Sequence, residues 1–228
     1  MNLVILAAGV GSRINMGIPK AIIELVNGQT ILERQIDIAK QFISTEKVYV
    51  VTGYKQEMII EKFPQVNIIT NPSYQVTNTA ESLSIALGSI GLETTIWING
   101  DVVFDIDAFS LIAGSQCSCM GVIECETGYE EIKFSTSIDG TIDRVSKEVQ
   151  PSLGEAIGIN KIIGKDYRLL LNALTQCKKE DYFERGIELA IDDGLRIFPA
   201  YINKGFAIEI DFEKDLDKVN NYLLSNDV

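Results

Sequence analysis

The sequence predicts an α/β fold built on a mostly parallel sheet, and two patterns along the chain support it. In the first half, short aliphatic runs alternate with stretches whose apolar residues recur at helical spacing, which is typical of βαβ units. After about residue 115 the segments become shorter and are separated by turn residues, which indicates antiparallel strands. The 228 residues contain no repeat, linker or low-complexity stretch, so we expect one domain.

The elements of the first half begin with an aliphatic run at 3–6, which predicts a buried parallel strand that feeds a loop. Thr30 and Glu33 form a capping-box pattern ahead of a helix. Asn78 and Glu81 form a second N-cap pattern, followed by apolar residues on one helical face. Further strands are expected at 48–51, 66–69 and 95–98, and a further helix at 54–63.

The second half is expected to add a small antiparallel elaboration to this sheet. Turn residues separate the short segments there, and two longer amphipathic stretches follow them. We expect strands at 117–124, 130–136, 141–145, 156–163, 195–200 and 206–210, and helices at 164–177, at 181–192 and from about Phe212.

The composition excludes several classes of function. A net charge of −12 argues against a non-specific nucleic-acid surface. No apolar run approaches the roughly 18–20 residues that span a bilayer, and the opening run is too short for a secretory signal, so we expect a cytoplasmic protein without membrane contact.

Histidine is absent from the chain, which excludes His-based acid–base catalysis, Ser-His-Asp and Cys-His nucleophiles, and the usual zinc sites. Any catalysis must therefore depend on carboxylates, Lys, Arg and a hard metal ion. The cysteines at 117, 119, 125 and 177 form no C-x-x-C pair. We interpret them as small buried apolar residues in a reducing compartment.

A glycine-rich loop follows the first predicted strand and gathers the cations that an acidic protein needs to hold phosphate. Gly9 and Gly11 let the backbone approach a triphosphate, while Arg13 and Lys20 supply a forked cation and a point charge. An ordinary turn after a buried strand is the alternative. The dinucleotide fingerprint is excluded because its third glycine is replaced by Ile14, and a Walker loop is excluded because G-K-[ST] is absent.

The stretch from Leu6 through Lys20 resembles the signature L-A-A-G-x-G-[ST]-R-x(n)-P-K of the sugar-nucleotide and choline-phosphate nucleotidyltransferases, and it matches at every fixed position. The resemblance implies a Rossmann-like fold of the nucleotide-diphospho-sugar transferase type. It divides the single domain 1–228 into a nucleotide-binding half at 1–115 and an acceptor-binding half at 116–228. It further implies that Arg13 and Lys20 hold the phosphates and stabilise the transition state. The residues that it assigns to nucleotide contact are Leu6, Ala7, Ala8, Gly9, Gly11 and Ser12.

Two aspartates are candidate ligands of Mg²⁺, which neutralises the charge around phosphorus in such transfers. Asp101 follows the predicted strand at 95–98, and with Gly100 it occupies the metal-binding position of the family; a hairpin turn is the alternative. Asp211 matches the second metal-binding Asp of the family, and an N-cap is the alternative. Asp105 and Asp107 are expected to be the N-cap and a first-turn acid of a helix.

The nucleoside base is expected between two segments that follow strands. Thr52 and Gly53 correspond to the V-x-G-Y element that borders the base in the family, although an ordinary strand-to-helix turn would look the same. The segment 71–83 resembles the N-x(2)-Y-x(2)-T-N-x(3)-S-L pattern of cytidylyltransferases that act on phosphocholine or aminoethylphosphonate. That pattern assigns Asn78 and Ser82 to the nucleotide, while a helix cap is the alternative for Asn78.

Three residues are assigned to the acceptor by the resemblance. Glu155 begins an E-x-x-G-I strand, Tyr182 belongs to a helix that relatives use near the acceptor, and Glu209 precedes the second metal-binding Asp. A polar residue at a strand start is the alternative for Glu155. For Tyr182 the favoured alternative is an amphipathic helix packed by its aromatic residues.

The resemblance implies Mg²⁺-dependent attack of a phosphate or phosphonate oxygen on the α-phosphorus of a nucleoside triphosphate, with release of pyrophosphate. CTP is the expected nucleotide, and a sugar-1-phosphate enzyme that uses UTP or dTTP is the alternative. A glycosyltransferase or a non-catalytic nucleotide-binding protein of the same fold is a further alternative, which Arg13 and Lys20 argue against. Because members of the family are often dimers or larger, a homo-oligomer stays open.

Overall fold

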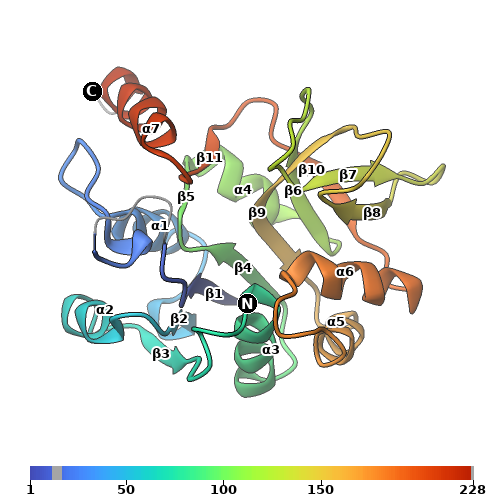
Figure 1. The fold of residues 1–228 in the computed structure, drawn as a ribbon, viewed down its shortest axis with the longest axis horizontal. Coiled ribbons are helices and arrows are strands. Elements are labelled where there is room, and N and C mark those ends of the chain that lie inside the picture. Colours follow the sequence, from blue (N-terminus) through green and yellow to red (C-terminus); the bar gives the residue numbers. More distant parts are fainter. Residues whose placement is uncertain (12–16, 227–228) are drawn as a thin grey trace.

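The computed structural model describes residues 1–11 and 17–226, in which helices flank a central sheet (Figure 1). The helices are α1 (Ile31–Ala39), α2 (Gln56–Lys62), α3 (Thr79–Ile90), α4 (Ile106–Gly114), α5 (Tyr167–Leu174), α6 (Phe183–Asp192) and α7 (Glu213–Asn226), with short 3₁₀ turns at Lys20–Ile22 and Thr45–Lys47. The strands are β1 (Asn2–Ala7), β2 (Val48–Thr52), β3 (Asn67–Thr70), β4 (Thr95–Asn99), β5 (Val102–Phe104), β6 (Cys119–Ile123), β7 (Lys133–Thr136), β8 (Ile142–Ser146), β9 (Gly154–Ile162), β10 (Phe198–Tyr201) and β11 (Ala207–Glu209).

The central sheet has the strand order β10-β6-β9-β4-β1-β2-β3. Strands β4, β1, β2 and β3 pair in parallel, as the alternation of strands and helices in the first half predicts. Strand β9 runs antiparallel to β4 and β6, and the antiparallel pair β7–β8 joins the sheet where β7 pairs with the first residues of β9. The prediction of an α/β fold with a mostly parallel sheet and a small antiparallel elaboration is confirmed.

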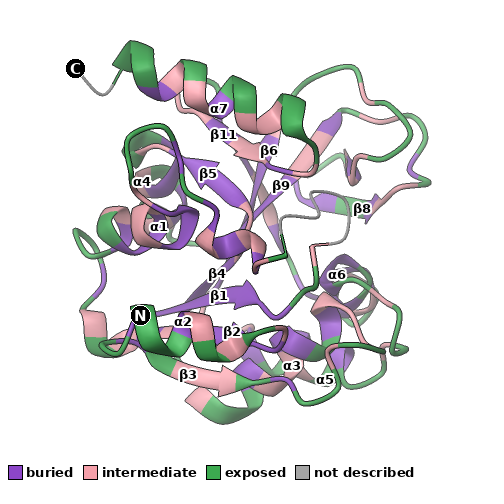
Figure 2. Ribbon diagram, turned by 60° about the vertical axis from the view of Figure 1, so that its left-hand side comes forward, coloured by how far each residue is buried: buried purple, intermediate pink, exposed green. Residues whose placement is uncertain are grey.

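The two faces of the sheet are covered by different helices, because successive side chains of a strand point to opposite sides. Leu3 and Ile5 of β1 pack on the side of α1, α2 and α4. Val4 and Leu6 pack on the side of α3, α5 and α6. Figure 2 shows β1 and β4 buried, while the edge strand β3 is half exposed. Each of these buried aliphatic side chains contributes about 1.5–3 kcal/mol to folding.

A second, two-stranded sheet lies beside the main one and holds the C-terminal helix. Strands β5 and β11 pair antiparallel between α7 and the main sheet (Figure 1). Val103 and Ile210 pack there against Val219 and Leu223 of α7, whose other face is exposed (Figure 2). This small cluster fixes the position of the chain on either side of β11.

The predicted helix caps are confirmed in detail. The Thr30 hydroxyl accepts from the Glu33 backbone N–H at 3.3 Å, and the Glu33 carboxylate accepts from the Thr30 N–H at 2.8 Å. Asn78 caps α3, and Asp105 caps α4 by accepting from Ala108. The ends of several predicted elements differ from the observed ones by a few residues, which is usual where terminal turns fray.

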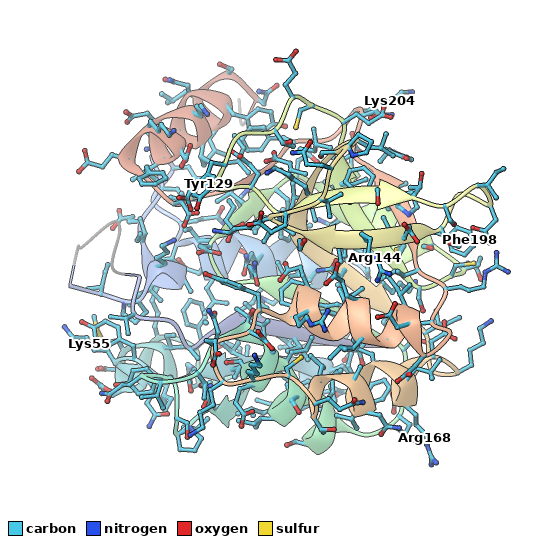
Figure 3. The ribbon with its side chains drawn as sticks, turned by 45° about the vertical axis from the view of Figure 1, so that its right-hand side comes forward. Lys55, Tyr129, Arg144, Arg168, Phe198 and Lys204 are labelled. Carbon is cyan, nitrogen blue, oxygen red and sulfur yellow. The ribbon has the colours of Figure 1, made fainter. Side chains whose placement is uncertain are left out.

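The interpretation of the cysteines as buried residues holds in full for one of the four, Cys119 of β6. Cys177 is partly buried, while Cys117 and Cys125 lie just outside the ends of β6 and are exposed, so the interpretation is wrong for these two. An ion pair links β8 to α6 in the second half of the chain. Arg144 of β8, labelled in Figure 3, contacts Asp192 at the end of α6 at 2.9 Å.

Among the described residues, no helix is both long and apolar enough to cross a membrane.

Candidate active site

The site forms where β1 and β4 end side by side. The parallel register places Leu6 opposite Asn99, and the Gly100 N–H donates to the Leu6 carbonyl at 2.9 Å. A Cβ atom at position 100 would lie 2.8 Å from that carbonyl oxygen, so the close approach requires glycine. Asp101, which leads from β4 into β5, therefore lies beside the C-terminal end of β1. This edge of a parallel sheet is where α/β proteins bind their ligands.

Asp211 reaches the same place through the small β5–β11 sheet. Glu209 pairs with Val102, and the Ile210 N–H donates to the Asp101 carbonyl at 2.9 Å. The hairpin alternative at Asp101 is excluded, because β5 pairs with β11 and not with β4. Helix α7 begins two residues after Asp211. Two aspartates from opposite halves of the chain thus meet at one point.

Lys20 lies between these two aspartates. Its Nζ donates to Asp101 Oδ2 at 3.0 Å and to Asp211 Oδ1 at 2.8 Å, and its side chain is 14% exposed. Burial alone would lower the pKa of Lys20, but the charge of Asp101 and the hydrogen bonds to both carboxylates raise it above its ordinary value. The ammonium therefore stays charged and bound to both carboxylates.

Glu209 adds a third carboxylate to this group. Asp101, Glu209 and Asp211 each offer an oxygen within 4.8 Å of the other two, and we call these three residues the carboxylate cluster. Burial, followed by the charges of Asp101 and Asp211, holds the pKa of Glu209 well above its ordinary value. Burial also raises the pKa of Asp101, against the opposing effect of Lys20. Concentrated negative charge of this kind favours a cation.

The glycine-rich loop adjoins Lys20. Gly11 has a φ of +63°, and a Cβ atom there would lie 2.7 Å from Lys20 Cγ, so the lysine stem packs directly against the loop backbone. Ser12 and Arg13, predicted to bind the nucleotide and its phosphates, lie outside the described residues. Lys20 consequently connects the glycine-rich loop with the carboxylate cluster.

Some of the residues predicted to bind the nucleotide line a smaller cavity of about 60 Å³ beside the loop. They include Ala8, Asn78 and Ser82, and Asn71 lines this cavity as well. The buried Asn71 amide donates to Ser82 Oγ at 3.0 Å and to Thr77 Oγ1 at 3.1 Å, which orients the polar groups of this wall. The helix-cap alternative for Asn78 also holds, since its side chain accepts from the backbone of Thr79.

Thr52 and Gly53 lie behind the loop and line neither cavity. A Cβ atom at Gly53 would lie 2.9 Å from the Ala8 carbonyl, and the Tyr54 N–H donates to that carbonyl at 3.1 Å. The Thr52 hydroxyl donates to the Gln56 side chain. These contacts support the loop backbone from the side opposite the larger cavity.

A cavity of about 690 Å³ opens in front of the loop and the carboxylate cluster. It is lined by sequence-predicted residues from both halves of the chain: Leu6, Ala7, Gly9, Gly11, Lys20, Asn78, Gly100, Asp101, Glu155, Tyr182, Glu209 and Asp211. This volume is within the range of small-molecule sites in proteins.

Glu155 and Tyr182, which were predicted to bind the acceptor, lie on the far wall of this cavity. Packing of α6 by aromatic residues, the favoured alternative, holds for Phe183, which is 1% exposed and meets Trp97 edge to face, but not for Tyr182, which is 45% exposed. The reason is that Tyr182 occupies the N-cap position, before the helical face begins. The Lys147 ammonium lies 5.9 Å from the centre of its ring.

The far wall carries further acidic residues that were not identified from the sequence. Glu126, Glu130 and Glu131 line it together with Glu155, whose pKa is raised by burial and then by the charge of Glu131, and Asp215 lines the same cavity from the first turn of α7. The three glutamates lie on the segment that joins β6 to β7, so only the folded chain brings them into one cavity with Glu155 and Asp215. Glu209 was predicted to bind the acceptor, but the structure places it in the carboxylate cluster. Its position two residues before Asp211 was a usable signal for this, because such residues share one face of an extended chain.

Comparison with known proteins places this site in a family. Residues 3–118 match the MobA-like NTP transferase domain. The chain is 26% identical to the choline-phosphate cytidylyltransferase of Haemophilus influenzae over 239 residues, covering 99% of each chain. It is 24% identical over 233 residues to the bifunctional protein GlmU of Methanococcus maripaludis, covering 99% of this chain and 55% of that protein. The chain thus spans about half the length of the GlmU proteins that it matches.

The fold is shared with solved nucleotidyltransferases. The CTP:phosphocholine cytidylyltransferase of Streptococcus pneumoniae superposes with a TM-score of 0.80 at 19% identity, covering 97% of this chain and 98% of that one. The inositol-1-phosphate CTP transferase of T. maritima gives a TM-score of 0.80 at 18% identity, covering 98% and 94%. The protein belongs to the MobA-like NTP transferase domain family, and its homologues include a choline-phosphate cytidylyltransferase.

Proposed function

We propose that the protein transfers a nucleotidyl group from a nucleoside triphosphate, with CTP favoured, to a small phosphate or phosphonate acceptor. An acceptor oxygen attacks the α-phosphorus, the bond from that phosphorus to the bridging oxygen of the β-phosphate breaks, and pyrophosphate leaves. The observation that carries this proposal is the meeting of Lys20, Gly11 and the carboxylate cluster at the end of β1 and β4. Residues 1–115 would hold the nucleotide and 116–228 the acceptor.

The carboxylate cluster fits Mg²⁺, because its donors are all anionic oxygens from converging side chains. Asp101 and Asp211 would hold the ion, with Glu209 beside them, and the ion would neutralise charge on the phosphates. Lys20 and Arg13 would bind phosphate oxygens and stabilise the negative charge of the transition state. Gly9 and Gly11 would present backbone N–H groups to the same phosphates.

The acceptor is proposed to carry a positive charge as well as its phosphate, as phosphocholine and aminoethylphosphonate do. Glu126, Glu131 and Glu155 make the far wall of the cavity negative, so it would repel an acceptor that carries only anionic groups. Lys147 already places an ammonium over the Tyr182 ring, beside a carboxylate of Glu130 at 3.3 Å. These are the groups that recognise ammonium ions. The full-length similarity to a choline-phosphate cytidylyltransferase supports the same choice.

The test is an assay of pyrophosphate release with each of CTP, UTP, ATP, GTP and dTTP against phosphocholine, aminoethylphosphonate and several sugar 1-phosphates, with Mg²⁺ or EDTA. We expect turnover with CTP and an amino-bearing acceptor, and none in EDTA. Asp101→Asn and Asp211→Asn should each abolish it, whereas Asp107→Asn on the exposed side of α4 should not. UTP or dTTP with a sugar phosphate would identify the alternative enzyme. Absence of turnover with every pair would favour a binding protein.

A further inference from the structure

The ammonium of Lys20 occupies the centre of the site that the proposed function assigns to a metal ion. Its two short contacts use one oxygen each of Asp101 and Asp211, at 3.0 and 2.8 Å. These two carboxylates are also the members of the carboxylate cluster that come from opposite halves of the chain. In this arrangement the positive charge that holds the cluster together belongs to the protein itself.

A divalent ion and this ammonium compete for the same oxygens. An ion that bound Asp101 and Asp211 at about 2.1 Å would lie within about 5 Å of Nζ, since both cations would contact the same oxygen atoms. Two cations at that separation repel each other strongly in a site where Lys20 is only 14% exposed.

The Lys20 ammonium can also reach a second position, beside the glycine-rich loop. Its stem packs against Gly11 of the phosphate loop, so rotation of the flexible side chain can carry Nζ from the cluster toward phosphates on that loop. Phosphates bound there would therefore attract the ammonium and release the aspartate oxygens. Binding of the phosphates and binding of the metal would then favour each other, as thermodynamic linkage requires.

We propose that, in the nucleotide-free protein, Lys20 serves as the resident cation of the carboxylate cluster and keeps a divalent metal out until its ammonium is drawn away. The inference rests on the proposed function for the identity of the metal site. It requires no particular nucleotide or acceptor. It also gives Lys20 a role before the reaction, in addition to any contact with phosphate during it.

The first test measures Mn²⁺ binding to the nucleotide-free protein by electron paramagnetic resonance, which reports free Mn²⁺. Lys20→Met should bind Mn²⁺ at least about fivefold more tightly than the wild type, within the usual range of coupling between sites. Lys218→Met is the matched control, because it removes one positive charge from the same cavity, where Lys218 pairs with Asp215 at 3.6 Å. The control should change the affinity by less than about twofold, since exposed charges are largely screened.

Adding Asp101→Asn to Lys20→Met should remove the gain. Equal affinity in the wild type and Lys20→Met, an equal gain in Lys218→Met, or a gain that survives Asp101→Asn would each overturn the proposal. None of these measurements involves turnover. If the protein has no transferase activity but Lys20→Met still binds Mn²⁺ more tightly, the proposed function is refuted and this inference stands.

A second measurement uses the wild type and does not depend on the folding of a variant. Acetylation of individual lysines by a trace of acetic anhydride is followed by mass spectrometry, with and without saturating Mn²⁺. Lys20 should be labelled slowly in the free protein, because its ammonium is paired with two carboxylates, and several times faster once Mn²⁺ has displaced it. Labelling of the exposed Lys218 should not change. Unchanged or slower labelling of Lys20 with Mn²⁺ would refute the exclusion.

Discussion

Glu184 lies in the first turn of α6 with its carboxyl group buried, and its ionisation should make the stability of the protein depend on pH. The residue is 6% exposed, and among the described residues its Oε2 has no hydrogen-bond partner. Burial raises the pKa of Glu184 to about 7 from an ordinary value of 4.5, against the opposing effects of a backbone hydrogen bond and of the charge of Lys147. The cluster residue Glu209 is the other charged group that interacts with it.

The magnitude follows from this difference in pKa. A carboxyl group whose pKa is higher in the folded than in the unfolded protein stabilises the fold below the unfolded pKa, and this contribution is lost as the pH rises through the folded pKa. The difference between 4.5 and about 7, at about 1.4 kcal/mol per pKa unit, corresponds to a loss of about 3 kcal/mol. Most of that loss should fall between pH 5 and 8.

Glu184→Gln removes the titration while keeping the size of the side chain. We expect the wild type to lose about 3 kcal/mol relative to this variant as the pH rises, so the variant should be relatively more stable at pH 8 than at pH 5. Urea unfolding in EDTA at pH 5, 6, 7 and 8 measures the difference. Glu180→Gln, an exposed residue on the loop before α6, is the control and should follow the wild type. Parallel curves for the wild type and Glu184→Gln, within about 1 kcal/mol, would refute the reasoning.

Three further predictions concern positions that shape the site. Gly11→Ala should weaken nucleotide binding at least about tenfold in calorimetry, because the added Cβ meets the Lys20 stem and the φ of +63° disfavours alanine; unchanged affinity would show that the loop adapts. Gln35→Ala should cost about 2 kcal/mol in urea unfolding, since the Gln35 amide donates to the buried carbonyls of Asn99 and Val102 at 2.9 and 2.7 Å. Asp105→Ala should make α7 more sensitive to limited proteolysis, because Asp105 accepts from the Tyr222 hydroxyl at 3.0 Å; unchanged cleavage would count against this anchor.

Much of the fold could be predicted from local patterns, including a strand at 206–210 that contains β11, but β5 and its pairing with β11 could not. The aliphatic runs at 3–6 and 95–98 mark central strands because such strands are buried on both faces. Strands β5 and β11 have three residues each and lie in opposite halves of the chain. So short a segment carries no period, and its pairing is decided by tertiary packing against α7.

The candidate site was predicted in part for the same physical reasons. Lys20, Asp101 and Asp211 were identified by their resemblance to a family signature, and the structure brings them within hydrogen-bonding distance. Their mutual contact could not be derived, because it depends on a pairing between distant strands. Tyr182 and Phe183 show that a sequence pattern does not locate the start of a helix to a single residue. Which of the two side chains faces the cavity depends on where α6 begins.

The pairing of β5 with β11 has a consequence for the order in which the protein matures. The glycine-rich loop and Asp101 are made before Asp211, which follows strand β11 and depends on it for its position. A nascent chain that has not yet passed residue 211 has no second aspartate to set against Lys20. The carboxylate cluster therefore arises only after residue 211 has been made, and a chain terminated before it would keep its glycine loop without the means to complete a cation site.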